Sequence, residues 1–223
     1  MLVALYGVYE LIRGIRHVDL SAATANAAQI VRIERYLHVF SELDLQHLTQ
    51  RVPLLPDVLA LLYPTLHVVG TLGILIWVYR SRRPAYPFVR TALVVMTALA
   101  LVGYLAYPVA PPRLSVAGFM DIVSRESPLD LGSKLLGRFY NPVAAVPSLH
   151  FAYALLFGGT LILTARHLLV RIAGGVLPAL TLLVIVSTGN HFYFDAFTGG
   201  VVAVVGLLVA RRACRIAPTP TAP

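Results

Sequence analysis

Residues 168–195 read LLVRIAGGVLPALTLLVIVSTGNHFYFD, an apolar segment that ends in a histidine and an aspartate. Between Leu168 and Thr188 the only charged residue is Arg171. A helix needs about 20 mostly apolar residues to cross a bilayer, so this segment predicts a membrane span. Of the 223 residues, 58% are hydrophobic and 13% are charged, and the mean hydropathy is +0.77. Soluble domains carry about 25% charged residues, so this composition excludes an ordinary soluble protein, a disordered chain and a fibrous repeat.

Other apolar segments of spanning character are residues 54–79, 91–107, 151–165 and 196–210. Residues 1–15 predict a weaker span, because they are short and contain Glu10 and Arg13. Residues 22–52 alternate apolar and charged side chains, which predicts an amphipathic helix at the membrane interface. We therefore expect an all-α polytopic membrane protein, with about six transmembrane helices in a bundle and an N-terminal interfacial helix.

These patterns divide the chain into three parts. Residues 1–53 hold the short first span and the interfacial segment, and residues 54–212 form the main transmembrane domain. Residues 213–223 contain three prolines and are expected to be a disordered tail.

The distribution of arginines predicts the orientation in the membrane. Three short segments carry basic residues and no acid, and their arginines are Arg80, Arg82, Arg83, Arg90, Arg166, Arg171, Arg211, Arg212 and Arg215. Basic residues accumulate on the cytoplasmic side of a membrane, so we expect these segments and the C-terminus to face the cytoplasm. The membrane is expected to be a bacterial plasma membrane. The connections 108–148 and 189–193 then lie on the extracytoplasmic side. The net charge of +8 is attributed to this orientation and not to nucleic-acid binding.

Three polar stretches share that outer side although they are far apart in the sequence: Pro111-Pro112-Arg113, Pro147-Ser148-Leu149-His150 and residues 189–195. His191 and Asp195 are four residues apart, and a carboxylate on one imidazole nitrogen leaves the other free as a base, nucleophile or metal ligand. His150 lies in the first turn of a helix that Ser148 can cap, where free N–H groups suit a phosphate. Arg113 follows two prolines and can clamp a phosphate.

Each feature also has a purely structural interpretation: a hydrogen bond that closes a helix end, a polar helix start, or a contact with a lipid headgroup. Together, two histidines, a carboxylate and an arginine match what phosphoryl transfer through a covalent phosphohistidine needs. One histidine attacks phosphorus and the other protonates the leaving oxygen. The carboxylate orients the nucleophile, and the cation neutralises the equatorial oxygens.

Pro147-Ser148-x-His150 and His191-x-x-x-Asp195 resemble the second and third signature motifs of the type 2 phosphatidic acid phosphatase (PAP2) superfamily. The wider context is similar to the inositol phosphorylceramide synthase-like branch at residues 107–114, 144–150 and 188–191. The resemblance covers about residues 63–200.

This resemblance implies a PAP2-like six-helix membrane fold and a metal-independent phosphoryl-transfer site without a cofactor. The substrate would be a lipid phosphate or a phospholipid. His191 would be the nucleophile, His150 the general acid and Asp195 the orienting carboxylate. The residues expected to bind the substrate are Arg113, Ser148 and Asn190.

The chain departs from the family pattern at two cations. The first motif has a lysine, six residues and then Arg-Pro, whereas this chain has Ala106 at the lysine position and Leu114 after the arginine. The third motif has an arginine six residues before the histidine, where this chain has Ile185. Candidates to replace the missing cations are Lys134 and Arg138 in the outer loop. These departures fit the synthase-like branch better than a phosphatase.

The sequence leaves several functions open. Water as the acceptor gives a phosphatase, and a hydroxyl of inositol or another polyol gives a transferase. A non-catalytic transporter or scaffold would use the His–Asp pair structurally. A metal-dependent hydrolase would use His150, His191 and Asp195 as ligands, and a chelator would distinguish it. His67, in the middle of a span, is interpreted as a structural interhelical hydrogen bond. The oligomeric state is not predicted.

Overall fold

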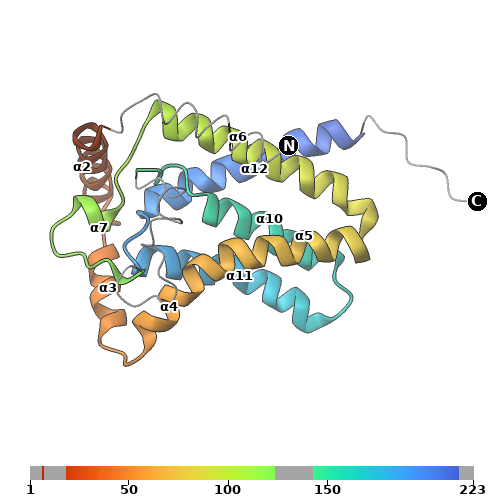
Figure 1. Ribbon diagram of the computed structural model, residues 1–223, viewed down its shortest axis with the longest axis horizontal. Coiled ribbons are helices and arrows are strands. Elements are labelled where there is room, and N and C mark those ends of the chain that lie inside the picture. The colour runs from red at the N-terminus through yellow and green to blue at the C-terminus, as the bar shows by residue number, and fades with distance from the viewer. Residues whose placement is uncertain (1–6, 8–18, 124–142, 216–223) are drawn as a thin grey trace, which may run out of the picture.

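The structure is a computed structural model that describes residues 7, 19–123 and 143–215. Its principal helices are α2 (Leu20–Tyr36), α3 (Glu42–Gln50), α4 (Leu55–Pro64), α5 (Gly70–Ser81), α6 (Tyr86–Ala106), α7 (Pro112–Ser115), α10 (Leu149–Thr164), α11 (Leu168–Ser187) and α12 (Tyr193–Arg215) (Figure 1). A π-helical turn, η1 (Thr65–Val69), joins α4 to α5, and a 3-10 turn, η2 (Arg83–Ala85), joins α5 to α6. The described residues form no named strand, so the expected all-α fold is confirmed for them.

Four helical segments are long and apolar enough to cross a membrane: Leu55–Ser81, Arg83–Ala106, Leu168–Ser187 and Tyr193–Cys214. They make the protein an integral membrane protein. α10 is also apolar but has 16 residues, which corresponds to about 24 Å of helix against a hydrocarbon core of about 30 Å. The weak span expected at residues 1–15 lies outside the described residues except for Gly7. A total of six spans therefore stays a prediction.

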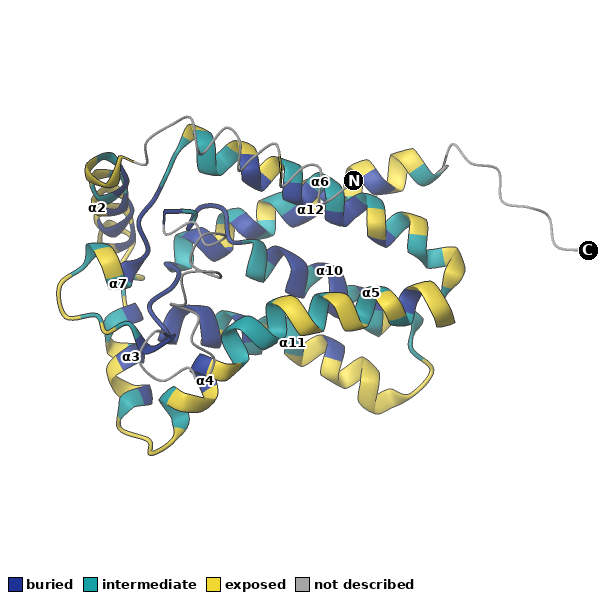
Figure 2. Cartoon of the chain, viewed as in Figure 1, coloured by how far each residue is buried: buried dark blue, intermediate teal, exposed yellow. Residues whose placement is uncertain are grey.

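The long helices pack around α10, which contacts α5, α6, α11 and α12 (Figure 1). Glycines permit the closest approach: a Cβ on Gly158 of α10 would lie 2.4 Å from the carbonyl oxygen of Gly174 on α11. The outward sides of the helices are apolar and exposed, with Leu169 79% and Phe197 68% exposed (Figure 2). Such surfaces suit contact with lipid, because large apolar areas are rarely exposed to water on soluble proteins.

α2 and α3 lie at one end of the long helices (Figure 1). The sequence predicts one amphipathic segment over residues 22–52, but the structure divides it into these two helices. α2 ends in a Schellman-type arrangement, with His38 at φ 58° and the amide of Val39 donating to the Glu34 carbonyl at 2.9 Å. α2 contacts α7 and α12, whereas α3 contacts α4 and α11. The two helices therefore pack against different elements at one end of the bundle, and their position at a membrane interface stays a prediction.

The C-terminal part of the chain extends α12 to Arg215, so the first residues of the expected tail at 213–223 are helical. Residues 216–223 lie outside the described residues.

Candidate active site

The three polar stretches predicted to converge do so at the bundle end that α2 and α3 cover. Backbone hydrogen bonds join them directly. The amide of Ser148 donates to the carbonyl of Asp195 at 3.0 Å, and the amide of Arg113 donates to the carbonyl of Gly189 at 3.0 Å. α7, the start of α10 and the turn into α12 with its first residues therefore form one connected structure.

His191 and Asp195 form a buried pair at the start of α12. His191 Nδ1 lies 3.1 Å from Asp195 Oδ2, and both side chains are almost inaccessible. The same carboxylate oxygen accepts the amide of Phe192 at 2.9 Å. His191 precedes the helix, whereas Asp195 lies in its first turn, so the carboxylate reaches back over the residues between them. An ionised Asp195 places the imidazole proton on Nδ1 and leaves the Nε2 lone pair available for chemistry.

His150 is brought to this pair by the start of α10. Ser148 caps that helix, with its Oγ accepting the amide of Phe151 at 3.4 Å. The imidazole rings of His150 and His191 lie edge to face, with their centroids 5.4 Å apart. Gly199 permits this arrangement, because a Cβ there would lie 2.4 Å from the Ser148 carbonyl oxygen. The backbone before His150 therefore rests directly on α12.

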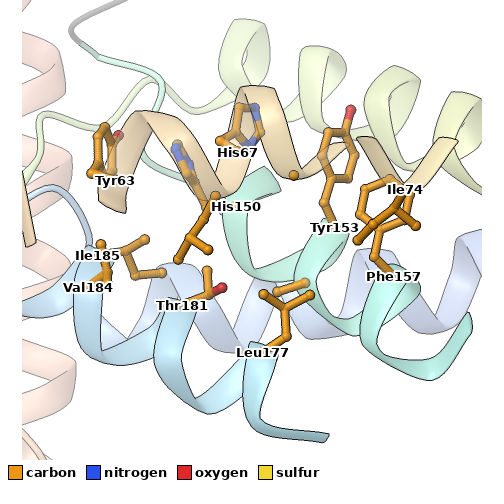
Figure 3. Close-up of a pocket in the computed structure, with 13 residues that line it drawn as sticks. Tyr63, His67, Ile74, His150, Tyr153, Phe157, Leu177, Thr181, Val184 and Ile185 are labelled. Atoms are coloured by element: carbon orange, nitrogen blue, oxygen red, sulfur yellow. The ribbon is translucent and has the colours of Figure 1, made fainter. Parts of the chain in front are cut away.

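A row of aromatic rings holds His150 on its other side (Figure 3). Its ring centroid lies 4.5 Å from that of Tyr63 and 4.1 Å from that of His67. His67 stacks in turn on Tyr153 at 5.3 Å, and the Tyr153 hydroxyl is 2.6 Å from the Thr97 hydroxyl. All of these rings except that of His191 line a cavity of about 40 Å³, with space for water but not for a lipid headgroup.

His67 differs from its sequence-based interpretation. A structural interhelical hydrogen bond is expected, but His67 Nδ1 has no hydrogen-bond partner among the described residues and the ring contacts are stacking contacts. His67 lies in the π-helical turn η1, a type of distortion that is frequent at functional sites. Its polar ring in an apolar span, four residues after Tyr63, is the signal by which the sequence could have linked it to the site.

Arg113 and Asn190 contact each other beside His191. Arg113 Nη1 donates to Asn190 Oδ1 at 2.8 Å, and Arg113 Nε lies 3.1 Å from Asp121 Oδ2. The Asn190 amide group is held in turn by the Thr188 hydroxyl at 2.8 Å. Two residues expected to bind the substrate are therefore joined in one hydrogen-bonded group.

The expected contribution of Ser148 to phosphate binding changes in one respect. Its backbone N–H is already used by the Asp195 carbonyl, so only its hydroxyl proton is left to donate to a phosphate. Lys134 and Arg138, the candidates for the missing cations, lie outside the described residues.

Two glutamates that the sequence analysis did not single out complete the start of α12. Glu42 Oε1 accepts the amide of Tyr193 at 3.1 Å, and Glu34 Oε1 accepts the amide of Phe194 at 2.7 Å. Glu42 and Glu34 are 0% and 2% exposed. Burial and the neighbouring Glu42 raise the pKa of Glu34 to about 9, so Glu34 keeps its proton at neutral pH. One sequence signal could have indicated these caps. The residue before the helix is Phe192, whose side chain has no hydrogen-bond acceptor, so another part of the chain must bind the free amides.

The raised pKa of Glu34 predicts a pH-dependent stability. Between pH 4.5 and about 9, folded Glu34 binds a proton that the unfolded chain has lost, so the stability from this residue falls as pH rises. A Glu34→Gln variant keeps a neutral side chain of the same shape. We expect its melting temperature, relative to the unsubstituted protein, to rise progressively from pH 6 to pH 9.5. Parallel melting curves for the two proteins across this range would contradict the assignment.

A groove of about 650 Å³ opens beside the same end of α12. Its apolar lining comes from the end of α2 and from α12 and includes Leu37, Phe194 and Phe197. Glu34 and His38 also line it. Its volume falls in the range of small-molecule binding sites.

In the part of the chain that the structure describes, no group of three or more His, Cys, Asp or Glu residues is arranged to hold a metal ion. His150, His191 and Asp195, the ligands of the metal-dependent alternative, do not form such a group.

Comparison with known proteins supports the family indicated by the motifs. No curated protein and no solved structure matched the chain. The family model described as the PAP2 superfamily matches residues 28–209, a region that includes α3 to α11, most of α12, and the two histidines with their partners. This match extends over most of the chain, and the chain belongs to the PAP2 superfamily.

Proposed function

We propose that this protein is an integral-membrane enzyme that transfers the phosphoryl group of a lipid phosphate through a covalent intermediate on His191. The observation that carries this proposal is the buried contact between His191 Nδ1 and Asp195 Oδ2 at 3.1 Å, with the His150 ring 5.4 Å from the His191 ring. A non-catalytic transporter or scaffold is not favoured, because the chain belongs to the PAP2 superfamily and its histidine and aspartate motifs meet at one bundle end.

The first step uses both histidines. His191 Nε2 attacks phosphorus, a P–N bond forms, and the P–O bond to the lipid alcohol breaks. Protonated His150 gives its proton to the leaving oxygen, so the lipid departs as a neutral alcohol. Asp195 stabilises the positive charge that develops on the His191 ring.

The second step reverses these roles. Neutral His150 takes a proton from water or from an acceptor hydroxyl, and the resulting oxygen attacks phosphorus. The P–N bond breaks and His191 regains its lone pair. Water yields inorganic phosphate, and a hydroxyl acceptor yields a new phosphoester. The resemblance to the synthase-like branch supports a polyol such as inositol as the acceptor.

The phosphate is expected to bind on the side of Arg113 and the Ser148 hydroxyl. The first amides of α12 are not available to the phosphate, because they donate to the carboxyl groups of Asp195, Glu42 and Glu34. Asn190 orients the Arg113 guanidinium through its 2.8 Å hydrogen bond. Arginine supplies the charge and the planar donor geometry that a phosphoryl group needs.

The lipid chain is expected to occupy the 650 Å³ groove lined by Leu37, Phe194 and Phe197, because this groove is apolar and lies beside the turn that carries His191. By the distribution of arginines, the site faces the extracytoplasmic side and the C-terminus faces the cytoplasm.

Purified protein in detergent tests this function with a panel of lipid phosphates and diphosphates, each with and without inositol. We expect release of phosphate, or a new phosphoinositol product by mass spectrometry, and we expect the rate to be unchanged by EDTA. Loss of turnover in EDTA that zinc or magnesium restores would instead establish the metal-dependent hydrolase. Absence of turnover with every donor, in protein that is folded by its melting curve, would contradict the proposed function.

A further inference from the structure

Three consecutive backbone amides at the start of α12 are each held by a different carboxylate. Phe192 N–H donates to Asp195, Tyr193 N–H to Glu42 and Phe194 N–H to Glu34, at 2.9, 3.1 and 2.7 Å. We propose that Glu34 and Glu42, contributed by α2 and α3, are positioning residues for His191. This proposal rests on the proposed function, because it assigns the two glutamates to the turn that carries the nucleophile.

The helix start explains why remote carboxylates are needed. The first amides of a helix have no partner within the helix, and a Ser, Thr, Asp or Asn before the helix usually satisfies one of them. In α12 that position is Phe192, which is fully buried and has no acceptor in its side chain. Glu42 and Glu34 supply the acceptors from 151 and 160 residues away in the sequence. The positive end of the helix dipole also favours oxygen acceptors there.

Asp195 connects these caps to His191. Its Oδ2 serves both the His191 imidazole and the Phe192 amide, whereas its Oδ1 is buried without a hydrogen-bond partner among the described residues. If Glu42 or Glu34 releases its amide, Asp195 can accept it instead, because Asp195 already binds the adjacent Phe192 amide and its Oδ1 has no partner among the described residues. Asp195 then turns away from His191, and the imidazole loses its fixed tautomer and orientation.

The carboxyl groups of Glu34, Glu42 and Asp195 lie close enough to interact electrostatically. Glu34 faces Glu42 on α3 and Asp195 on α12, and it lines the groove together with His38. At neutral pH Glu34 is protonated, because burial and Glu42 raise its pKa to about 9. Ionisation of Glu34 at higher pH adds a negative charge next to two other carboxyl groups. Repulsion then loosens the start of α12 and with it the His191 turn.

The test compares Glu42→Ala, Glu42→Gln and Glu34→Gln with Asp44→Asn in the full-length protein. Asp44 is an exposed acid on the same helix as Glu42, so its substitution is the matched control. We expect Glu42→Ala to lower kcat about tenfold with a smaller change in KM, because small misplacements of catalytic groups cost up to about 100-fold. Glu42→Gln keeps a side-chain oxygen that can accept the Tyr193 amide, so it is expected to lower kcat less. Glu34→Gln is expected to lower kcat less, and to remove the loss of kcat that the unsubstituted protein shows above about pH 9. Asp44→Asn is expected to change neither quantity.

A second measurement does not depend on turnover. His191 is 4% exposed, so a histidine-acylating reagent should modify it slowly in the unsubstituted protein. We expect Glu42→Ala to increase the modification rate of His191, followed by mass spectrometry, by about fivefold or more, whereas Asp44→Asn leaves it unchanged. An unchanged modification rate together with an unchanged kcat and pH profile would overturn the positioning role. Faster modification in protein without turnover would support that role while the proposed function fails.

Discussion

Replacing His191 by alanine is expected to abolish phosphoryl transfer, with kcat lower by roughly 10⁴-fold or more, as for the removal of other enzymatic nucleophiles. The side chain supplies the only atom that bonds to phosphorus in the proposed intermediate, so no remaining group can take its place. Acid-labile phosphate on His191, detected by mass spectrometry of protein quenched at alkaline pH during turnover, should be absent in the variant.

The control for this experiment is His167→Ala. His167 is an exposed histidine at the start of α11, away from the start of α10 and the turn before α12. We expect its substitution to leave turnover and the phosphohistidine signal unchanged. Full turnover in the His191→Ala protein would exclude the covalent mechanism.

Replacing His150 by alanine is expected to reduce turnover by an amount that depends on the leaving group. A lipid alcohol is a poor leaving group and needs a proton, so its transfer should slow by about 10²- to 10⁴-fold, the usual contribution of a general acid. A nitrophenyl phosphate releases a stable phenolate without a proton. The first step with this substrate, measured as the first-turnover release of nitrophenolate, should therefore slow by less than about tenfold.

This contrast distinguishes His150 from His191. His191→Ala should lose activity with both substrates, because the nucleophile is needed whatever the leaving group. Equal losses in the first-turnover release of the lipid alcohol and of nitrophenolate in His150→Ala, at an unchanged melting temperature, would show that His150 does not act as the general acid.

The sequence was sufficient for the elements whose signals are local. Runs of apolar residues predict the spans, and the Ser148 cap and the His191–Asp195 spacing depend on neighbours within four residues. The convergence of the three polar stretches also followed from the sequence, because the alternation of spans places every second connection on the same side of a membrane.

Other features involve partners that no local pattern identifies. The contacts of His67 with His150 and of Arg113 with Asn190 join residues 83 and 77 positions apart in the chain. An arginine in a polar loop has the same local sequence whether it is solvated or held against an asparagine. The division of residues 22–52 into α2 and α3 depends on the left-handed conformation of His38, which is not a glycine and therefore gave no warning of a helix end.

The sequence by itself determined that this chain is helical, lies in a membrane and carries the PAP2 histidine motifs at helix starts, because hydropathy and motif spacing are local properties. Only the tertiary structure decided what holds the turn of His191. Glu34 and Glu42 look like ordinary charged positions of an amphipathic segment, and they become buried caps only when α2 and α3 pack against α12. A hydrogen bond between residues 160 positions apart depends on that packing, which neither residue type nor spacing encodes.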